Sequence, residues 1–143
     1  GVFRKLSFIL LFYSNLIISS ILLGLILVIH FVHYQSFKFV DSVEFVKFHT
    51  FHVKNISFLV LPLMIAEAAT AIIICYSYFS VLPLINLLIV ALIWITTFLF
   101  QVPSHKKLSA GKSIPEIEKL IAGNLIRVYL WLFKVITATL IIL

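Results

Sequence analysis

Residues 56–101 read ISFLVLPLMIAEAATAIIICYSYFSVLPLINLLIVALIWITTFLFQ, and this stretch decides the fold. It holds two apolar runs of about 20 residues, the length that an α-helix needs to cross a bilayer. Only a few residues around Ser80–Pro83 join them, so the two helices must form an antiparallel hairpin. Pro83 suits the first turn of the second helix, where its missing N–H is not needed.

Two further apolar runs lie on either side of this hairpin. The chain of 143 residues is 63% hydrophobic and only 11% charged, and its mean hydropathy is +1.22. This composition lies outside that of soluble proteins and leaves room for a single membrane domain, residues 1–143. We predict an all-α, antiparallel four-helix bundle in the membrane, with spans at residues 6–32, 56–78, 81–101 and 120–143.

The connections between the spans carry helix signals of their own. In the stretch 34–55, Asp41–Glu44 has the form of a helix start, a capping residue followed three positions later by Glu. We therefore expect helix two to begin near Ser42 and to extend well beyond the bilayer, with a kink at Pro62. Ser113–Glu116 is expected to start helix four.

The basic residues predict how the chain sits in the membrane. The connections 34–55 and 103–119 carry seven lysines, whereas the opposite side has only Arg4 and Lys5. The positive-inside rule then places both connections in the cytoplasm and both termini outside. The net charge of +6 suits lipid headgroups rather than nucleic acid, so the expected partners are the bilayer and, as alternatives, other membrane subunits or further copies of the chain.

All five histidines fall near the predicted cytoplasmic end. His30 and His33 form one His-x-x-His pair, His49 and His52 form another, and His105 follows span three. Residues three apart share a helix face, so each pair offers two imidazoles in one direction. Imidazole suits zinc, iron and copper, and one or two histidines suffice as axial ligands of haem.

These histidines allow two interpretations. In the first, at least three of His33, His49, His52 and His105 converge on a metal ion or haem, with His30 outside the site and Asn124, Gln101 and Ser104 as candidate acceptors for the second ring nitrogens. In the second, the histidines lie at the membrane interface and bind water, headgroups or backbone.

Four polar residues interrupt the apolar sequences of spans two and four. Glu67 and Lys134 lie at similar depth, and the cost of a charge in the bilayer predicts a buried ion pair between them, or a neutral Glu67. This pair either fixes the register of the helices or forms part of a path for protons or substrate. Asn124 and Arg127 share one face of span four, where they either bind an anionic or carbonyl-bearing substrate or let Arg127 reach the headgroups.

One motif resembles a known family. The stretch Gln101-Val102-Pro103-Ser104-His105, followed by Asn124-Leu125-Ile126-Arg127, is similar to the pattern after the third span of the anthrone-oxygenase-like family of small four-helix membrane proteins. The resemblance covers about a quarter of the chain. It implies a four-helix bundle with its functional end at this interface and oxygen chemistry there, although the extra histidines depart from the family's pattern.

Three functions are compatible with the sequence. The first is an accessory or uncharacterised subunit of a membrane complex. The second is a metal- or haem-dependent oxidoreductase that acts on a lipophilic substrate at the histidine-rich end. The third is a small proton-coupled transporter that uses Glu67 and Lys134.

Overall fold

The computed structural model describes residues 1–143 and consists of four helical rods joined by short turns, with no strand. All four rods are long and apolar enough to cross a membrane. The first rod comprises α1 (Val2–Val28), the π-helical turn η1 (Ile29–His33), α2 (Tyr34–Ser36) and the 3₁₀ turn η2 (Phe37–Phe39). The second is α3 (Phe45–Ser77). The third comprises α4 (Val81–Thr96), the π-helical turn η3 (Thr97–Gln101) and α5 (Val102–Leu108), and the fourth is α6 (Ile114–Ile142).

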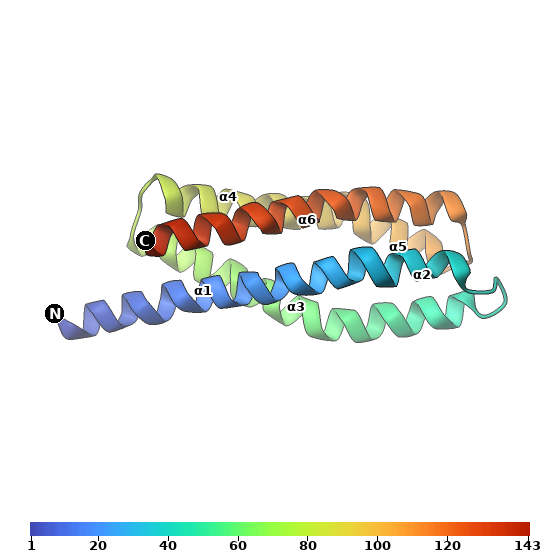
Figure 1. Cartoon of the computed structure of the whole chain (residues 1–143), viewed down its shortest axis with the longest axis horizontal. Helices are drawn as coiled ribbons and strands as arrows, with labels where there is room; N and C mark the ends of the chain where they lie inside the picture. Colours follow the sequence, from blue (N-terminus) through green and yellow to red (C-terminus); the bar gives the residue numbers. More distant parts are fainter.

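The rods run up and down in turn, and both termini lie at the same end of the bundle (Figure 1). Around the bundle the order is α1, α3, α4, α6, and each of these helices packs against its two neighbours. The predicted antiparallel four-helix bundle is therefore confirmed. The end opposite the termini holds η1, η3, α2 and α5, and it is the end where the five histidines lie; we call it the histidine end.

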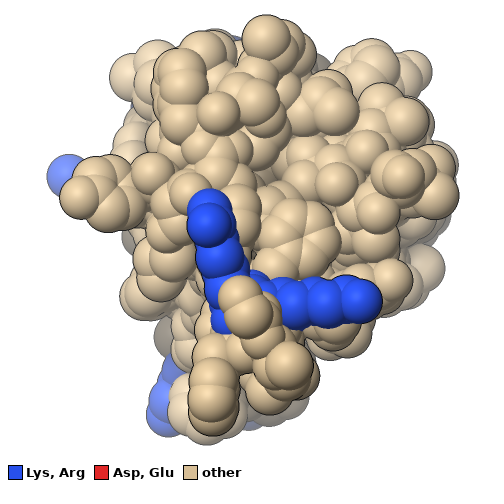
Figure 2. Space-filling model, turned by 90° about the vertical axis from the view of Figure 1, so that its left-hand side faces the viewer, with Lys and Arg blue, Asp and Glu red and all other residues tan.

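The two ends of the bundle differ in how many charged residues they carry. At the end of the termini the only basic residues are Arg4 and Lys5, and the face seen there shows no acidic side chain (Figure 2). At the histidine end the charged residues pair across the surface, as in the salt bridge of 2.7 Å between Lys38 and Glu118. Lys112 Nζ also donates to the carbonyl oxygen of Lys38 over 2.8 Å and so ties the two loops of this end together.

The second helix is longer than a bilayer requires, as predicted, but it begins later than expected. Its first residue is Phe45 rather than Ser42, because Asp41 Oδ1 accepts from the Val43 N–H over 2.8 Å and holds residues 42–44 in a turn. The helix then continues through Pro62 to Ser77 without a break.

The ends of the other rods also differ in part from the predicted bounds. The first rod stays helical to Phe39, so residues 34–39, expected to belong to a connection, extend span one instead. The third rod likewise extends to Leu108. The fourth begins as predicted: Ser113 Oγ accepts from the Glu116 N–H, and Pro115 lies in the first turn.

Both π-helical turns lie at the histidine end. η1 carries His30 and His33, and η3 ends at Gln101. A π-helical turn holds one more residue than an α-helical turn, so it changes the direction of the side chains that follow; such turns occur frequently at functional sites. Their position thus indicates that a functional site lies at the histidine end.

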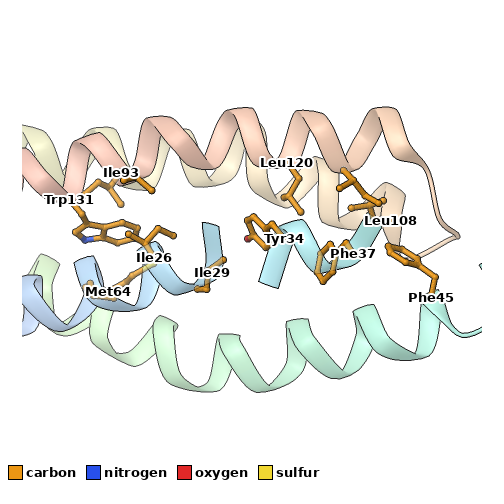
Figure 3. Close-up of a cluster of buried hydrophobic side chains, with 13 residues drawn as sticks. Ile26, Ile29, Tyr34, Phe37, Phe45, Met64, Ile93, Leu108, Leu120 and Trp131 are labelled. Carbon is orange, nitrogen blue, oxygen red and sulfur yellow. The ribbon is translucent and has the colours of Figure 1, made fainter. Parts of the chain in front are cut away.

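The apolar core is drawn out along the bundle axis from Trp131 to Phe45 (Figure 3). Trp131 and Ile93 lie at one end of this cluster, and the rings of Tyr34, Phe37 and Phe45 fill the part at the histidine end. The outer faces of the helices are apolar as well, which suits contact with lipid. The inward faces are the ones that carry the polar residues.

Gly123 allows α6 to approach η3 closely, which predicts a position-specific cost of a larger side chain. A Cβ at Gly123 would lie 2.9 Å from Gln101 Nε2 and 3.1 Å from Phe100 Cβ, whereas one at Gly24 would meet nothing within 4 Å. We expect Gly123→Leu to lower the free energy of unfolding by about 1–3 kcal/mol, the usual cost of overpacking. Gly24→Leu is the matched control and should be neutral. Unfolding in detergent measures both, and equal stabilities would contradict the close contact.

Candidate functional site

A chain of close polar contacts links three elements at the histidine end. Nε2 of His49 on α3 lies 3.0 Å from Nδ1 of His105 on α5. Nε2 of the same His105 lies 3.1 Å from the hydroxyl of Tyr34 on α2. Tyr34 is 3% exposed and His49 is 2% exposed, so these contacts lie inside the bundle. His105 therefore uses both ring nitrogens for contacts within the protein.

The other histidines take no part in this series of polar contacts. The rings of His33 and His52 lie side by side with their centroids 5.1 Å apart. Phe37 lies against both His49 and His52, with ring centroids 5.6 Å and 5.2 Å away. His49, His52 and His105 thus pack against the buried rings of Tyr34 and Phe37.

The four histidines predicted to share one ligand sphere lie in two close pairs, His49 with His105 and His33 with His52. No group of three or more His, Cys, Asp or Glu side chains is placed to hold a metal ion. Tyr34 packs against His52 and His105, and Phe37 packs against His49 and His52.

His30, predicted to lie apart from the other histidines, belongs to a second polar group. Asn124 Nδ2 donates to His30 Nδ1 over 3.3 Å, and Arg127 Nη1 donates to Asn124 Oδ1 over 3.2 Å. Arg127 is 6% exposed and points inward instead of reaching the headgroups. Its guanidinium lies over the ring of Trp131, 5.1 Å from the centroid, an arrangement that stabilises a cation.

Deeper in the bundle, all four rods contribute to a buried polar core, which comprises Asn15, Ser19, Glu67, Thr70, Asn86, Trp131 and Lys134. Trp131 Nε1 donates to both carboxylate oxygens of Glu67 over 3.2 Å, which joins α6 to α3 across the bundle. Asn86 Nδ2 donates to Asn15 Oδ1 over 3.4 Å and joins α4 to α1 across the other diagonal.

Glu67 and Lys134 both point into the bundle and are fully buried, but they form no direct salt bridge. The ion pair expected from the sequence is replaced by neutral partners: Lys134 Nζ donates to Asn15 Oδ1 over 2.8 Å and to Ser19 Oγ over 2.9 Å. Ser19 also faces the Glu67 carboxylate and so stands between the two charges. The Asn15 amide and the Ser19 hydroxyl on α1 thus take the place that the Glu67 carboxylate was predicted to have beside Lys134.

A cavity of about 330 Å³ opens between α3 and the third rod, and we call it the lateral pocket. Its walls are apolar, with Ile56, Val60 and Phe98 among them. Its polar side chains are those of Tyr34, Ser57, Trp94, Thr97, Gln101, His105 and Arg127. In a membrane-spanning bundle this opening faces lipid.

Three buried polar atoms of the lateral pocket lack a hydrogen-bond partner. They are Trp94 Nε1, Gln101 Oε1 and Arg127 Nε, half of the six such side-chain atoms in the protein. A buried polar group without a partner costs about 1–3 kcal/mol, so such groups are rare, and each of these three can still bind a ligand or a water molecule. The lateral pocket is therefore the strongest candidate for a binding site.

The sequence indicated some of these residues and missed others. The sequence predicts a role for Arg127, Gln101 and His105, but not for Tyr34 or Trp94. Tyr34 directly follows His33 on the rod that enters the site, so its position was a usable signal. Trp94 looked like an ordinary apolar residue of span three, and no pattern in the sequence indicates the π-helical turn that follows it.

The chain matches no protein-family model, no curated protein and no solved structure. The resemblance of residues 101–105 and 124–127 to the anthrone-oxygenase-like family thus stays a prediction.

The buried polar core predicts coupling between Glu67 and Lys134. Lys134→Met removes the nearby cation and leaves a buried carboxylate, so we expect the free energy of unfolding to fall by about 3 kcal/mol or more. The double variant Glu67→Leu/Lys134→Met should lose less than the sum of the single changes, with a coupling of about 1 kcal/mol or more. Unfolding in detergent measures the cycle, and Lys5→Met is the control at an exposed lysine. Strictly additive changes would show that the two charges do not interact.

Proposed function

We propose that this chain is a multi-pass membrane protein that binds a lipophilic molecule from the bilayer in the lateral pocket. The observation that carries the proposal is that three residues with an unpartnered polar atom, Trp94, Gln101 and Arg127, line one apolar-walled cavity. Ligand pockets commonly combine apolar walls with a few polar groups that fix orientation, and roughly 300–1,000 Å³ is their usual volume.

The three unpartnered polar atoms indicate which chemical groups the ligand should carry at its polar end. Arg127 Nε–H and Trp94 Nε1–H are donors and need an acceptor, such as a carbonyl or carboxylate oxygen. Gln101 Oε1 is an acceptor and suits a hydroxyl or N–H group. An apolar body in contact with Ile56, Val60 and their neighbours completes the fit.

Binding of this kind supports the role of an accessory subunit that holds a lipid-phase molecule for a membrane complex. The oxidoreductase alternative needs a metal or haem, and the histidines expected to hold it contact one another, Tyr34 and Phe37 instead. The transporter alternative needs a path to Glu67 and Lys134, and both are sealed at 0% exposure. Binding in the lateral pocket needs neither a metal or haem nor a path to these buried charges.

The orientation in the membrane is part of the proposal. Arg4 and Lys5 are the only basic residues at the end of the termini, whereas seven lysines lie in the loops or the first three turns of the helices at the histidine end. This asymmetry supports a cytoplasmic histidine end and termini on the other side.

The binding proposal is tested with two probes that quench tryptophan fluorescence, 9,10-dibromostearic acid and decyl-ubiquinone. Trp94 lines the pocket, and the chain has only one other tryptophan. We expect saturable quenching of the purified protein by at least one probe. Val60→Phe narrows the pocket and should abolish it, whereas Leu88→Phe, on an exposed face of α4, should not. Quenching that never saturates, or that Val60→Phe leaves unchanged, would overturn the proposal.

The orientation is tested by cysteine labelling in a Cys75→Ala background, since Cys75 is the only cysteine. Ser80→Cys lies between α3 and α4, and Ser109→Cys lies just after α5; both positions are exposed. We expect a membrane-impermeant maleimide to label Ser80→Cys in intact cells and Ser109→Cys only after permeabilisation. The reverse pattern would place the histidine end outside.

A further inference from the structure

The buried charges of the bundle do not balance. Two basic side chains, Arg127 and Lys134, are 6% and 0% exposed, and both lie on α6. Glu67 is the only acidic residue among the spans; the other four, Asp41, Glu44, Glu116 and Glu118, lie in or beside the loops of the histidine end. One carboxylate thus serves two cations, and a charge is left over in a region where a bilayer offers no counter-ion.

The unmatched charge is that of Arg127. Glu67 and Lys134 lie on opposite sides of Ser19, and Trp131 Nε1 occupies both Glu67 oxygens. Arg127 has no acidic partner; it is held by the amide oxygen of Asn124 and the face of Trp131, and the hydroxyl of Tyr34 lies nearby. All of these partners are neutral, and the Nε–H has none.

Arg127 is also the one charged residue of the lateral pocket. It lies roughly 20 Å along α6 from Ile114, at about 1.5 Å per residue, and so well inside the helical bundle. A charge at this depth is matched only by an anion that enters from the bilayer. A guanidinium presents parallel N–H groups whose spacing suits the two oxygens of a carboxylate.

We infer that the ligand of the lateral pocket is a long-chain carboxylate of the free fatty acid type, which binds with its head on Arg127 and its chain between α3 and the third rod. This inference rests on the proposed function and adds the charge of the ligand to it. The carboxylate supplies the missing negative charge, and it accepts from Arg127 Nε–H and Trp94 Nε1–H. The apolar walls at Ile56, Val60 and Phe98 take the chain.

The test compares 9,10-dibromostearic acid with its methyl ester, which has the same chain and a neutral carbonyl head. In the wild-type protein we expect the acid to bind at least about tenfold more tightly than the ester, as befits a charged hydrogen bond. Arg127→Gln should remove this preference but keep weak binding of the ester. Arg4→Gln is the matched control, because Arg4 is the only other arginine and is exposed at the far end.

The outcomes separate this inference from the proposed function. If acid and ester bind equally well to the wild-type protein, the carboxylate inference fails and the lateral pocket remains a site for neutral lipids. If neither probe nor decyl-ubiquinone binds saturably, both fail. The comparison in the wild-type protein decides the point even if Arg127→Gln does not fold.

Discussion

A bilayer offers no water to a polar group, and this constraint governs the interior of the bundle. Asn15 on α1, Glu67 on α3, Asn86 on α4 and Lys134 on α6 find hydrogen-bond partners only at the bundle axis. Because the hydrogen bonds cross both diagonals, no helix can rotate or slide without leaving a polar atom unpaired. The apolar contacts along the lengths of the rods fill space, whereas the polar core selects one register among the many that apolar packing allows.

The same constraint shows how the polar core differs from the lateral pocket. In the core almost every strong donor is matched within the protein, so the site is closed and structural. Around Arg127 the matching is incomplete, although this residue is nearly as well buried. Trp131 connects the two regions, with Glu67 at its ring nitrogen and Arg127 over its face. A group bound at Arg127 therefore lies two side chains away from the buried carboxylate.

The sequence allowed the fold to be predicted because hydropathy and span length are strong signals in a membrane. The four spans, the hairpin at Ser80 and the start of α6 follow from it directly. α3 starts three residues later than predicted, because Asp41, which can cap a helix, accepts a hydrogen bond within a turn here. The contacts of the histidines could not be predicted for another reason: spacing fixes only the face of one helix, whereas His49 on α3, His105 on α5 and Tyr34 on α2 meet from three different rods.

The π-helical turn η3 (Thr97–Gln101) has a consequence for the tolerance of this chain to deletions. An α-helix advances by about 100° per residue, and the turn accommodates one residue more than the regular helix would. Loss of a single residue from η3 would restore a regular helix and leave the direction of α5 nearly unchanged, because the wider turn only absorbs the extra residue. His105 would then keep its contact with Tyr34, and the third rod would stay long enough to insert. The chain should thus tolerate the loss of one residue at η3, whereas the same loss from a regular helix would turn everything that follows by about 100°.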